Sequence, residues 1–127
     1  MNVETQQHLT TLRDLLTYRI RELEAEVHAA ALQRASDAGA VDAATVSDRK
    51  DEAEAEQRAE VEAQSEQLAS AALADCRAAL RRLDEGVYGD CRDCGEPIPL
   101  ARLMVQPQAA RCAPCQAQFE GAHRIAA

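Results

Sequence analysis

The sequence predicts a mainly α protein with a long antiparallel helical hairpin, a coiled coil, followed by a small C-terminal module that carries four cysteines. Ala supplies 27 of the 127 residues, and only three side chains are aromatic. An Ala-rich and highly charged chain of this kind favours long helices that bury narrow stripes over a wide core. All four prolines follow residue 96, which places the long helices in the front part of the chain.

An apolar stripe predicts the first helix. From Leu9 onward, large apolar residues recur every three or four positions among charged ones, at Leu12, Leu16, Ile20, Leu23 and Val27. This spacing is typical of one amphipathic helix, and we expect the helix to end near residues 34–36.

A second stripe predicts a second helix over Ser47–Glu85. Its apolar residues again fall at helical spacing, at Val61, Leu68, Ala72, Cys76, Leu80 and Leu83. Gly86 follows directly and is a natural C-cap, because glycine readily adopts the positive φ at which many helices end. Cys76 lies on the stripe and is interpreted as a small buried apolar residue.

Neither stripe is wide enough to make its helix stable alone in water, and the connection at 37–46 is short. The simplest arrangement is therefore an antiparallel hairpin in which each stripe buries the other. We expect residues 1–86 to form this hairpin, with its tip around 37–53. Residues 87–127 are expected to form a separate module that ends in a short helix.

The formal charge of −8 is unevenly distributed along the chain. Residues 37–67 hold ten acidic side chains against three basic ones, whereas residues 91–127 have a net charge of +1. Acidic helices repel nucleic acid, so we expect no direct sequence-specific DNA binding. A merely solvated acidic face is the plain alternative to a functional one.

No apolar run approaches the roughly 20 residues of a membrane span. The first residues also lack the basic and apolar regions of a secretory signal. We therefore expect no membrane contact and a cytoplasmic location. Five cysteines in a reducing compartment favour metal or redox chemistry over disulfides.

Four cysteines form two C-x-x-C pairs, Cys91 with Cys94 and Cys112 with Cys115, and 17 residues separate the pairs. Two pairs at this separation are typical of a zinc ribbon or a related zinc finger, in which four thiolates surround one Zn²⁺. Four protein ligands leave no position for water or substrate, so the zinc is expected to be structural. A redox C-x-x-C motif, an iron–sulfur cluster and two disulfides are the alternatives.

The residues around these pairs resemble a known signature. They are Tyr88, Gly89, Gly95, Ile98, Arg102, Leu103 and Pro107. Together with the four cysteines, they resemble the C4 zinc-finger signature of the DksA/TraR family of bacterial transcription factors. Because this family joins such a finger to a long helical hairpin, the resemblance covers roughly residues 5–125.

This resemblance implies a partner and a mechanism that composition alone does not. Members of the family bind RNA polymerase and insert the hairpin tip into its secondary channel, near the active centre, where they modulate initiation. The tip motif of the founding member, D-x-x-D-x-A, is matched here by Asp48, Asp51 and Ala53. As a plain alternative, Asp48 would cap the second helix and Asp51 would interact with its dipole. The resemblance favours a regulator over an enzyme, and we expect a monomer.

The chain departs from the family pattern in two respects. The best-known member of the family binds the alarmone ppGpp with basic side chains at positions that correspond here to Asp75, Gln106 and Gln116, which lack the required positive charge. This difference implies weak or no dependence on ppGpp. The chain also begins at the first hairpin helix, without the N-terminal segment of longer members, and is expected to be a shorter relative.

A structural or adaptor protein, whose finger and hairpin bind another protein, is the second hypothesis. It requires the tip to be dispensable. Replacement of both tip aspartates therefore separates the two hypotheses.

Overall fold

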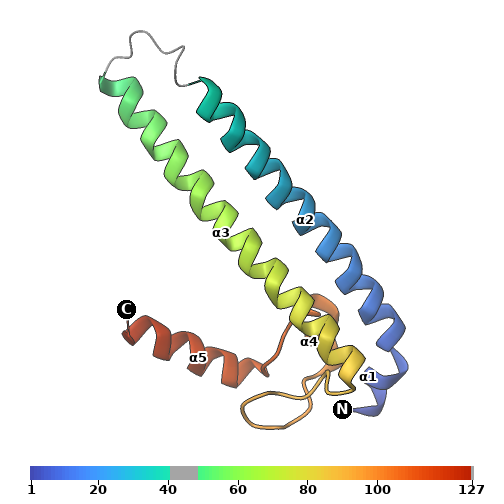
Figure 1. Ribbon diagram of the computed structural model, residues 1–127. Coiled ribbons are helices and arrows are strands. Elements are labelled where there is room, and N and C mark those ends of the chain that lie inside the picture. The colour runs from blue at the N-terminus through green and yellow to red at the C-terminus, as the bar shows by residue number, and fades with distance from the viewer. Residues whose placement is uncertain (41–48, 127) are drawn as a thin grey trace. The chain divides into compact units, whose positions relative to one another are not determined.

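The computed structural model describes the backbone of residues 1–40 and 49–126 and the side chains of residues 1–38 and 51–122. Helices dominate these ranges (Figure 1): α1 (Val3–Gln7), α2 (Leu9–Ala40), α3 (Arg49–Glu85), α4 (Leu100–Val105) and α5 (Ala113–Ala126). One bridge joins Asp90 and Pro97, and the described residues contain no longer strand. The predicted mainly α fold with a long helical hairpin is confirmed. No described helix is apolar enough over a sufficient length to cross a bilayer.

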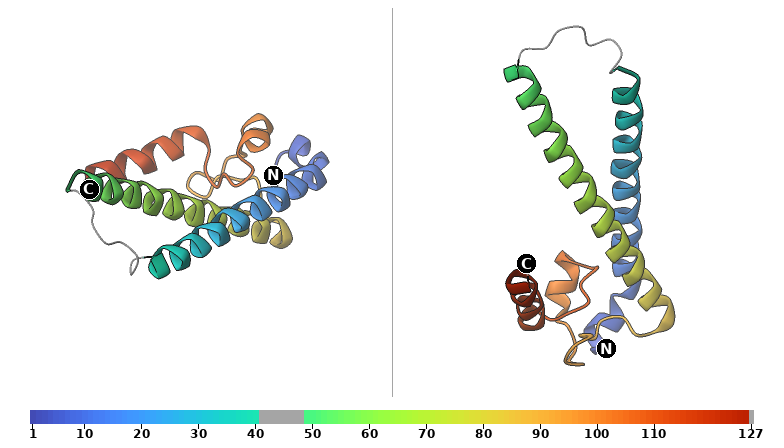
Figure 2. Two further views of the ribbon diagram at one scale, coloured as in Figure 1. Left: turned by 90° about the horizontal axis from the view of Figure 1, so that it is seen from above. Right: turned by 60° about the vertical axis from the view of Figure 1, so that its left-hand side comes forward.

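The chain divides into two compact units. One comprises Met1–Ile20 and Asp75–Ala127, and the other comprises Arg21–Ala74. Both α2 and α3 contribute to each unit, so each contains a pair of antiparallel helical segments (Figure 2). Each unit also buries its own set of apolar side chains.

The core of the first unit contains side chains from α2, α3 and the cysteine-rich segment. Leu12 and Leu16 of α2 are fully buried, which confirms the predicted stripe of the first helix. Cys76 of α3 is 1% exposed, as expected for a small apolar residue of a helix stripe, and burial raises the pKa of its thiol. The cysteine-rich segment adds three fully buried side chains, which are Tyr88, Ile98 and Leu103.

The second unit buries Leu23 of α2 together with Ala69 and Leu73 of α3. This burial corrects the predicted stripe of the second helix, because Leu68 is 73% exposed and Val61 is 64% exposed. Each residue turns an α-helix by about 100°, so positions 68 and 69 face different directions. Ala69 is buried and the larger Leu68 is exposed, because position 69 faces α2 and position 68 does not. The direction of a position on the helix therefore has more influence on burial here than the size of its side chain.

The end of α2 lies beyond its predicted position. The helix continues to Ala40 instead of ending near residues 34–36. Its last turns are rich in Ala, which has the highest helix propensity, and Gln33 donates a 3.0 Å hydrogen bond to Asp37 one turn later. The predicted start of the second helix lies outside the described residues, and α3 is described from Arg49.

The end of α3 agrees with the prediction. Gly86 has φ +77°, and its N–H donates a 3.2 Å hydrogen bond to the carbonyl of Leu83. The next N–H, of Val87, donates to the carbonyl of Arg82 at 3.0 Å. These two bonds form a Schellman motif, so the predicted role of Gly86 as C-cap is confirmed.

A short helix that the sequence analysis does not predict precedes α2. The side-chain oxygen of Asn2 caps α1 by accepting hydrogen bonds from the backbone N–H groups of Glu4 (2.7 Å) and Thr5 (3.4 Å). At the other end, His8 is the C-cap residue, and its ring nitrogen lies 2.8 Å from the carbonyl oxygen of Glu4. α1 has five residues, too few for apolar periodicity to reveal it.

Candidate metal centre and helical tip

The four predicted zinc ligands lie together in the first unit. Their sulfur atoms are all within 4.8 Å of one another, in Cys91, Cys94, Cys112 and Cys115. The sulfurs of Cys94 and Cys112 are 3.8 Å apart. Four thiolates placed tetrahedrally about 2.3 Å from one Zn²⁺ would also be about 3.8 Å apart, so the cluster fits this ion. The predicted cofactor, one structural zinc, is confirmed by this donor set together with the family match given below.

Backbone hydrogen bonds shape the turn around the first cysteine pair. The N–H of Gly95 donates to the carbonyl of Cys91 at 2.9 Å, and the N–H of Cys91 donates to the carbonyl of Glu96 at 2.8 Å. A further bond of 2.8 Å runs from the N–H of Ile98 to the carbonyl of Gly89 and closes the loop. Gly95 has φ +79°, which glycine adopts without the steric penalty of a Cβ.

The second cysteine pair is positioned by the start of α5. The N–H of Gln116 donates a 2.9 Å hydrogen bond to the carbonyl of Cys112, and Cys115 lies in the first turn of the helix. The N–H of Arg92 donates to the carbonyl of Ala110 at 2.9 Å, which joins the segment before this pair to the first pair. The turn around the first cysteine pair and the start of α5 therefore bring the two cysteine pairs together.

The thiols of the cluster differ in acidity without a metal. Burial raises the pKa of Cys91, but backbone N–H groups, chiefly that of Cys94, stabilise its thiolate and bring the pKa down to about 6. Hydrogen bonds with the neighbouring thiols, above all that of Cys112, raise the pKa of Cys115 to about 12. Zn²⁺ binds thiolates, so its binding displaces the protons that these thiols hold without the metal.

Asp93, Arg111 and Phe119 support the metal centre, and the sequence analysis missed this role. The Arg111 side chain donates a 2.7 Å hydrogen bond to Asp93, and its guanidinium carbon lies 3.8 Å from the centre of the Phe119 ring. The Arg102 side chain donates to the carbonyl oxygen of Arg111 at 3.1 Å. Asp93 lies inside the first C-x-x-C motif, and Arg111 directly precedes the second. Two opposite charges beside cysteine pairs that meet at one metal are the feature of the sequence that could have predicted this contact.

The N-terminal residues pack against the turn of the first cysteine pair. The α-amino group of Met1 lies 2.7 Å from a carboxylate oxygen of Asp90. Gly89 has φ +93°, and a Cβ at this position would lie 3.3 Å from side-chain atoms of both Met1 and Thr5. Gly89 therefore permits the close approach of α1 to this turn. The family signature contains this glycine but does not show why a glycine is needed there.

Two of the three predicted tip residues belong to the described part of the chain. Asp51 and Ala53 are exposed near the start of α3, whereas Asp48 lies outside the described residues. Asp51 lies in the first turn of the helix, where an acidic side chain interacts favourably with the helix dipole. This position suits both the dipole role and a tip role, and the tip role stays a prediction.

The three positions that the family resemblance links with ppGpp lie on three separate segments and line one cleft. Asp75 of α3, Gln106 after α4 and Gln116 of α5 border a cavity of about 580 Å³. Its lining also includes four arginines that the sequence analysis did not connect with these positions, namely Arg82, Arg92, Arg102 and Arg111. The last two donate the hydrogen bonds described above, and Arg82 donates a 3.4 Å hydrogen bond to the carbonyl of Gln108. Asp75 and Glu120 are acidic residues of the same lining, so the cleft is a mixed polar surface.

The fold and the metal centre define a class of protein, a helical hairpin with a C-terminal four-cysteine zinc finger. Residues 86–121 match the family model of the prokaryotic dksA/traR C4-type zinc finger. The RNA polymerase-binding transcription factor DksA of Caulobacter vibrioides is 45% identical over 47 residues, which are 37% of this chain and 33% of that protein. An uncharacterized protein of Aquifex aeolicus is 40% identical over 50 residues, which are 39% of this chain and 34% of that protein.

A solved structure extends the similarity to the hairpin. Transcription factor DksA2 from Pseudomonas aeruginosa is 29% identical with a TM-score of 0.70, and the match covers 93% of this chain and 87% of that chain. The chain spans about a third of the length of the curated relatives that it matches. Its zinc finger belongs to the DksA/TraR C4 type, and the resemblance to that family is confirmed.

Proposed function

We propose that this protein is a transcription regulator that binds bacterial RNA polymerase through the secondary channel. Its acidic hairpin tip would lie near the active centre and modulate initiation. One observation carries the proposal, namely the similarity of hairpin and finger to transcription factor DksA2 over 93% of the chain. The name of the Caulobacter relative, an RNA polymerase-binding transcription factor, supports the choice of partner.

The charge of the hairpin supports this mechanism. The unit formed by Arg21–Ala74 holds 13 acidic and five basic residues, a net charge of −8, which equals the net charge of the whole chain. Carboxylates near the start of α3 are attracted by basic side chains or by Mg²⁺ in the partner, and this attraction strengthens where water is excluded. The 37 residues of α3 correspond to about 55 Å of helix, so a channel of this depth is within reach.

The tip is tested with the double variant Asp48→Asn with Asp51→Asn, in the zinc-loaded protein and its cognate polymerase. We expect the regulation of initiation to be lost while the variant still binds polymerase, because the finger and the rest of the hairpin are unchanged. A photo-cross-linker at position 49 should react with secondary-channel or active-centre segments. Binding would be measured by the mobility of the complex, and regulation by single-round transcription.

The matched control is Glu56→Gln with Glu60→Gln. Both side chains are exposed on α3, and the pair removes the same two negative charges outside the tip. This control should regulate as the unchanged protein does. Equal regulation by the tip variant would contradict the proposed role of the tip and favour the adaptor hypothesis, and the absence of any complex at micromolar concentration would contradict polymerase binding itself.

We further propose that ppGpp affects this regulator weakly or not at all. Asp75 and the neutral Gln106 and Gln116 support this, because a tetra-anionic nucleotide needs basic partners that these side chains do not supply. The triple variant Asp75→Lys, Gln106→Arg and Gln116→Lys should make transcription sensitive to ppGpp. A strong response of the unchanged protein would instead assign nucleotide binding to the arginines of the same cleft.

We also propose that the protein acts in the cytoplasm as a monomer, is not an enzyme, and makes no sequence-specific contact with DNA. The net charge of −8 supports the last point, since phosphate neutralisation drives DNA binding. Sedimentation at micromolar concentration should give one species of 13.8 kDa. DNA affinity that falls steeply with salt and depends on sequence would contradict the proposal.

A further inference from the structure

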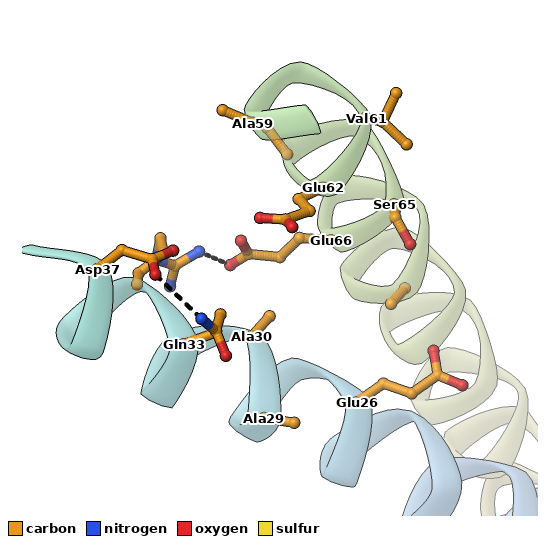
Figure 3. A pocket seen from close by; sticks show the side chains of 13 residues that line it. Glu26, Ala29, Ala30, Gln33, Asp37, Ala59, Val61, Glu62, Ser65 and Glu66 are labelled. Carbon is orange, nitrogen blue, oxygen red and sulfur yellow. Dashed lines mark hydrogen bonds and ion pairs between the residues drawn. The ribbon is translucent and has the colours of Figure 1, made fainter. Parts of the chain in front are cut away.

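An apolar groove lies between α2 and α3 in the unit formed by Arg21–Ala74. It has a volume of about 670 Å³ and faces solvent. Figure 3 shows Ala29 and Ala30 on the α2 side and Ala59 on the α3 side, with acidic side chains around them. The right-hand view of Figure 2 shows the two helices diverging toward residues 40 and 49.

Small side chains explain why this groove stays open. Leu23 and Leu73 fill the space between the helices in the buried layer of this unit. Beyond that layer, the lining changes to alanines, of which Ala59 and Ala63 are exposed. Methyl groups cannot fill the space between diverging helices, but they let the backbone of another helix approach closely.

Acidic side chains line the groove on both helices, and Figure 3 shows Glu62 and Glu66 pointing into the space between α3 and α2. Glu26 and Asp37 lie on the α2 side, and Glu62 and Glu66 lie on the α3 side. Arg34, the only basic residue among the described residues of the lining, forms an ion pair with Glu66 across the groove. No basic side chain in the described part of the chain pairs with Glu26 or Glu62, so these carboxylates are available to an external cation.

We propose that this groove is a docking site for a basic amphipathic helix of a partner protein. Small apolar side chains of that helix pack against the alanines, and its Lys or Arg side chains pair with the carboxylates of the lining and compete with Arg34 for Glu66. A second copy of this chain is a poorer occupant, because it would bring a surface with the same negative charge to the groove. The inference goes beyond polymerase binding and does not depend on it.

The dimensions of the groove suit such an occupant. Its lining runs from Glu26 to Asp37 on α2 and from Ala59 to Ala69 on α3. These segments correspond to about 15 to 18 Å of helix, or three turns. Three turns provide about three to four positions on one face of the docked helix. These positions are enough for apolar and charged contacts to fix how the docked helix is aligned along the groove.

Fluorescence anisotropy with synthetic peptides tests the proposal on the full-length, zinc-loaded protein. The probe is a labelled 21-residue helix with Ala and Leu on one face and Lys on the other. One comparison peptide carries Glu in place of every Lys, and another has the same composition in scrambled order. We expect saturable binding of the basic helix with a Kd on the order of 10 μM and at least tenfold weaker binding of both comparison peptides.

Two variants with matched controls locate the binding site. Glu62→Lys reverses one charge in the lining of the groove, and Glu56→Lys makes the same change on α3 outside it. Ala63→Leu adds bulk to the lining without a change in charge, and Ala55→Leu adds the same side chain outside the lining. Each groove variant should weaken binding about fivefold or more, and each control should stay within about twofold.

Several results would overturn the proposal. Equal weakening by Glu56→Lys and Glu62→Lys would indicate attraction by net charge alone, as would undiminished binding to Ala63→Leu. Absence of saturation with the basic helix would remove the site altogether. Sedimentation should show the same monomeric mass for Ala63→Leu and the unchanged protein, and a dimer that Ala63→Leu dissociates would assign the groove to a second copy.

Discussion

Tyr88 joins two parts of the cysteine-rich segment through one buried hydroxyl. Its side chain is fully buried, and the hydroxyl donates a 2.8 Å hydrogen bond to the carbonyl of Pro107. Burial raises the pKa of Tyr88 from 10.0 to about 12, although the nearby Arg82 guanidinium lowers it. The phenol is therefore neutral in the folded state at pH values where the unfolded chain already ionises.

The sign of the pH dependence follows from these two pKa values. Below pH 10 both states keep the proton, and the contribution of Tyr88 to stability is fully present. Between pH 10 and about 12 the unfolded state loses the proton first, so the free energy of unfolding should fall by about 1.4 kcal/mol per pH unit. Urea denaturation at several pH values measures this slope.

Tyr88→Phe should remove that slope and lower the free energy of unfolding at pH 7 by about 1 to 2 kcal/mol, because the Pro107 carbonyl loses its donor. Tyr18→Phe is the matched control, since Tyr18 is 66% exposed and its substitution removes a phenol from the surface. An unchanged alkaline slope in Tyr88→Phe would assign the pH dependence to other groups.

Gly89 should tolerate a methyl group less well than Gly86. Both residues have positive φ, but a Cβ at Gly89 also lies 3.3 Å from side-chain atoms of Met1 and Thr5, whereas a Cβ at Gly86 has nothing within 4 Å. Gly86→Ala should cost about 1 kcal/mol, and Gly89→Ala about 2 to 3 kcal/mol, with displacement of α1. Denaturation and the backbone NMR shifts of residues 1–8 would measure both effects, and equal costs would contradict close packing at Gly89.

At the scale of elements, α3 shows how the direction of a helix position decides burial. Leu73 is 6% exposed, whereas Leu68, five residues earlier, is 73% exposed. Leu73→Ala should therefore lower the free energy of unfolding by about 2 to 4 kcal/mol through lost burial and a residual cavity. Leu68→Ala should change it by less than about 0.5 kcal/mol.

Thermal denaturation followed by far-UV circular dichroism would compare the two leucine variants. Both make the same chemical change in the same helix, so helix propensity contributes equally to each. A larger cost for Leu68→Ala would restore the stripe that the sequence analysis predicted and would place the face with Leu73 toward solvent.

The whole molecule combines a metal-dependent part with an acidic helical part. The segment with the four cysteines buries three large side chains, Tyr88, Ile98 and Leu103, and a core of this size needs support from a metal, so zinc supplies much of its folding free energy. Removal of zinc by a chelator should unfold this segment while much of the hairpin stays helical. Near-UV circular dichroism, limited proteolysis and metal analysis would follow the two parts separately.

One result of the chelation experiment would contradict the structural role of zinc. A protein that has lost its zinc by metal analysis but keeps its near-UV signal and its resistance to proteolysis in residues 87–122 would contradict a structural role for the metal. Replacement of Cys76 by Ala is the matched control for the loss of one thiol, because Cys76 is buried on α3 outside the cluster. That variant should keep its zinc.

Short-range features of this chain were predictable because they depend on neighbouring residues. The α2 stripe follows from local spacing, and the C-cap at Gly86 follows from the conformational freedom of glycine. The zinc ligands followed from the spacing of the two cysteine pairs. The tip depends on family resemblance instead, and with Asp48 outside the described residues its role stays a prediction.

The sequence by itself determined the helical class, the hairpin and the metal, because helix periodicity and a four-thiolate donor set are properties of short segments. Tertiary structure alone decided which face of α3 is buried, the pairing of Asp93 with Arg111, and the meeting of Asp75, Gln106 and Gln116 in one cleft. These features join residues far apart in the chain, and their free energies depend on contacts that no local pattern encodes.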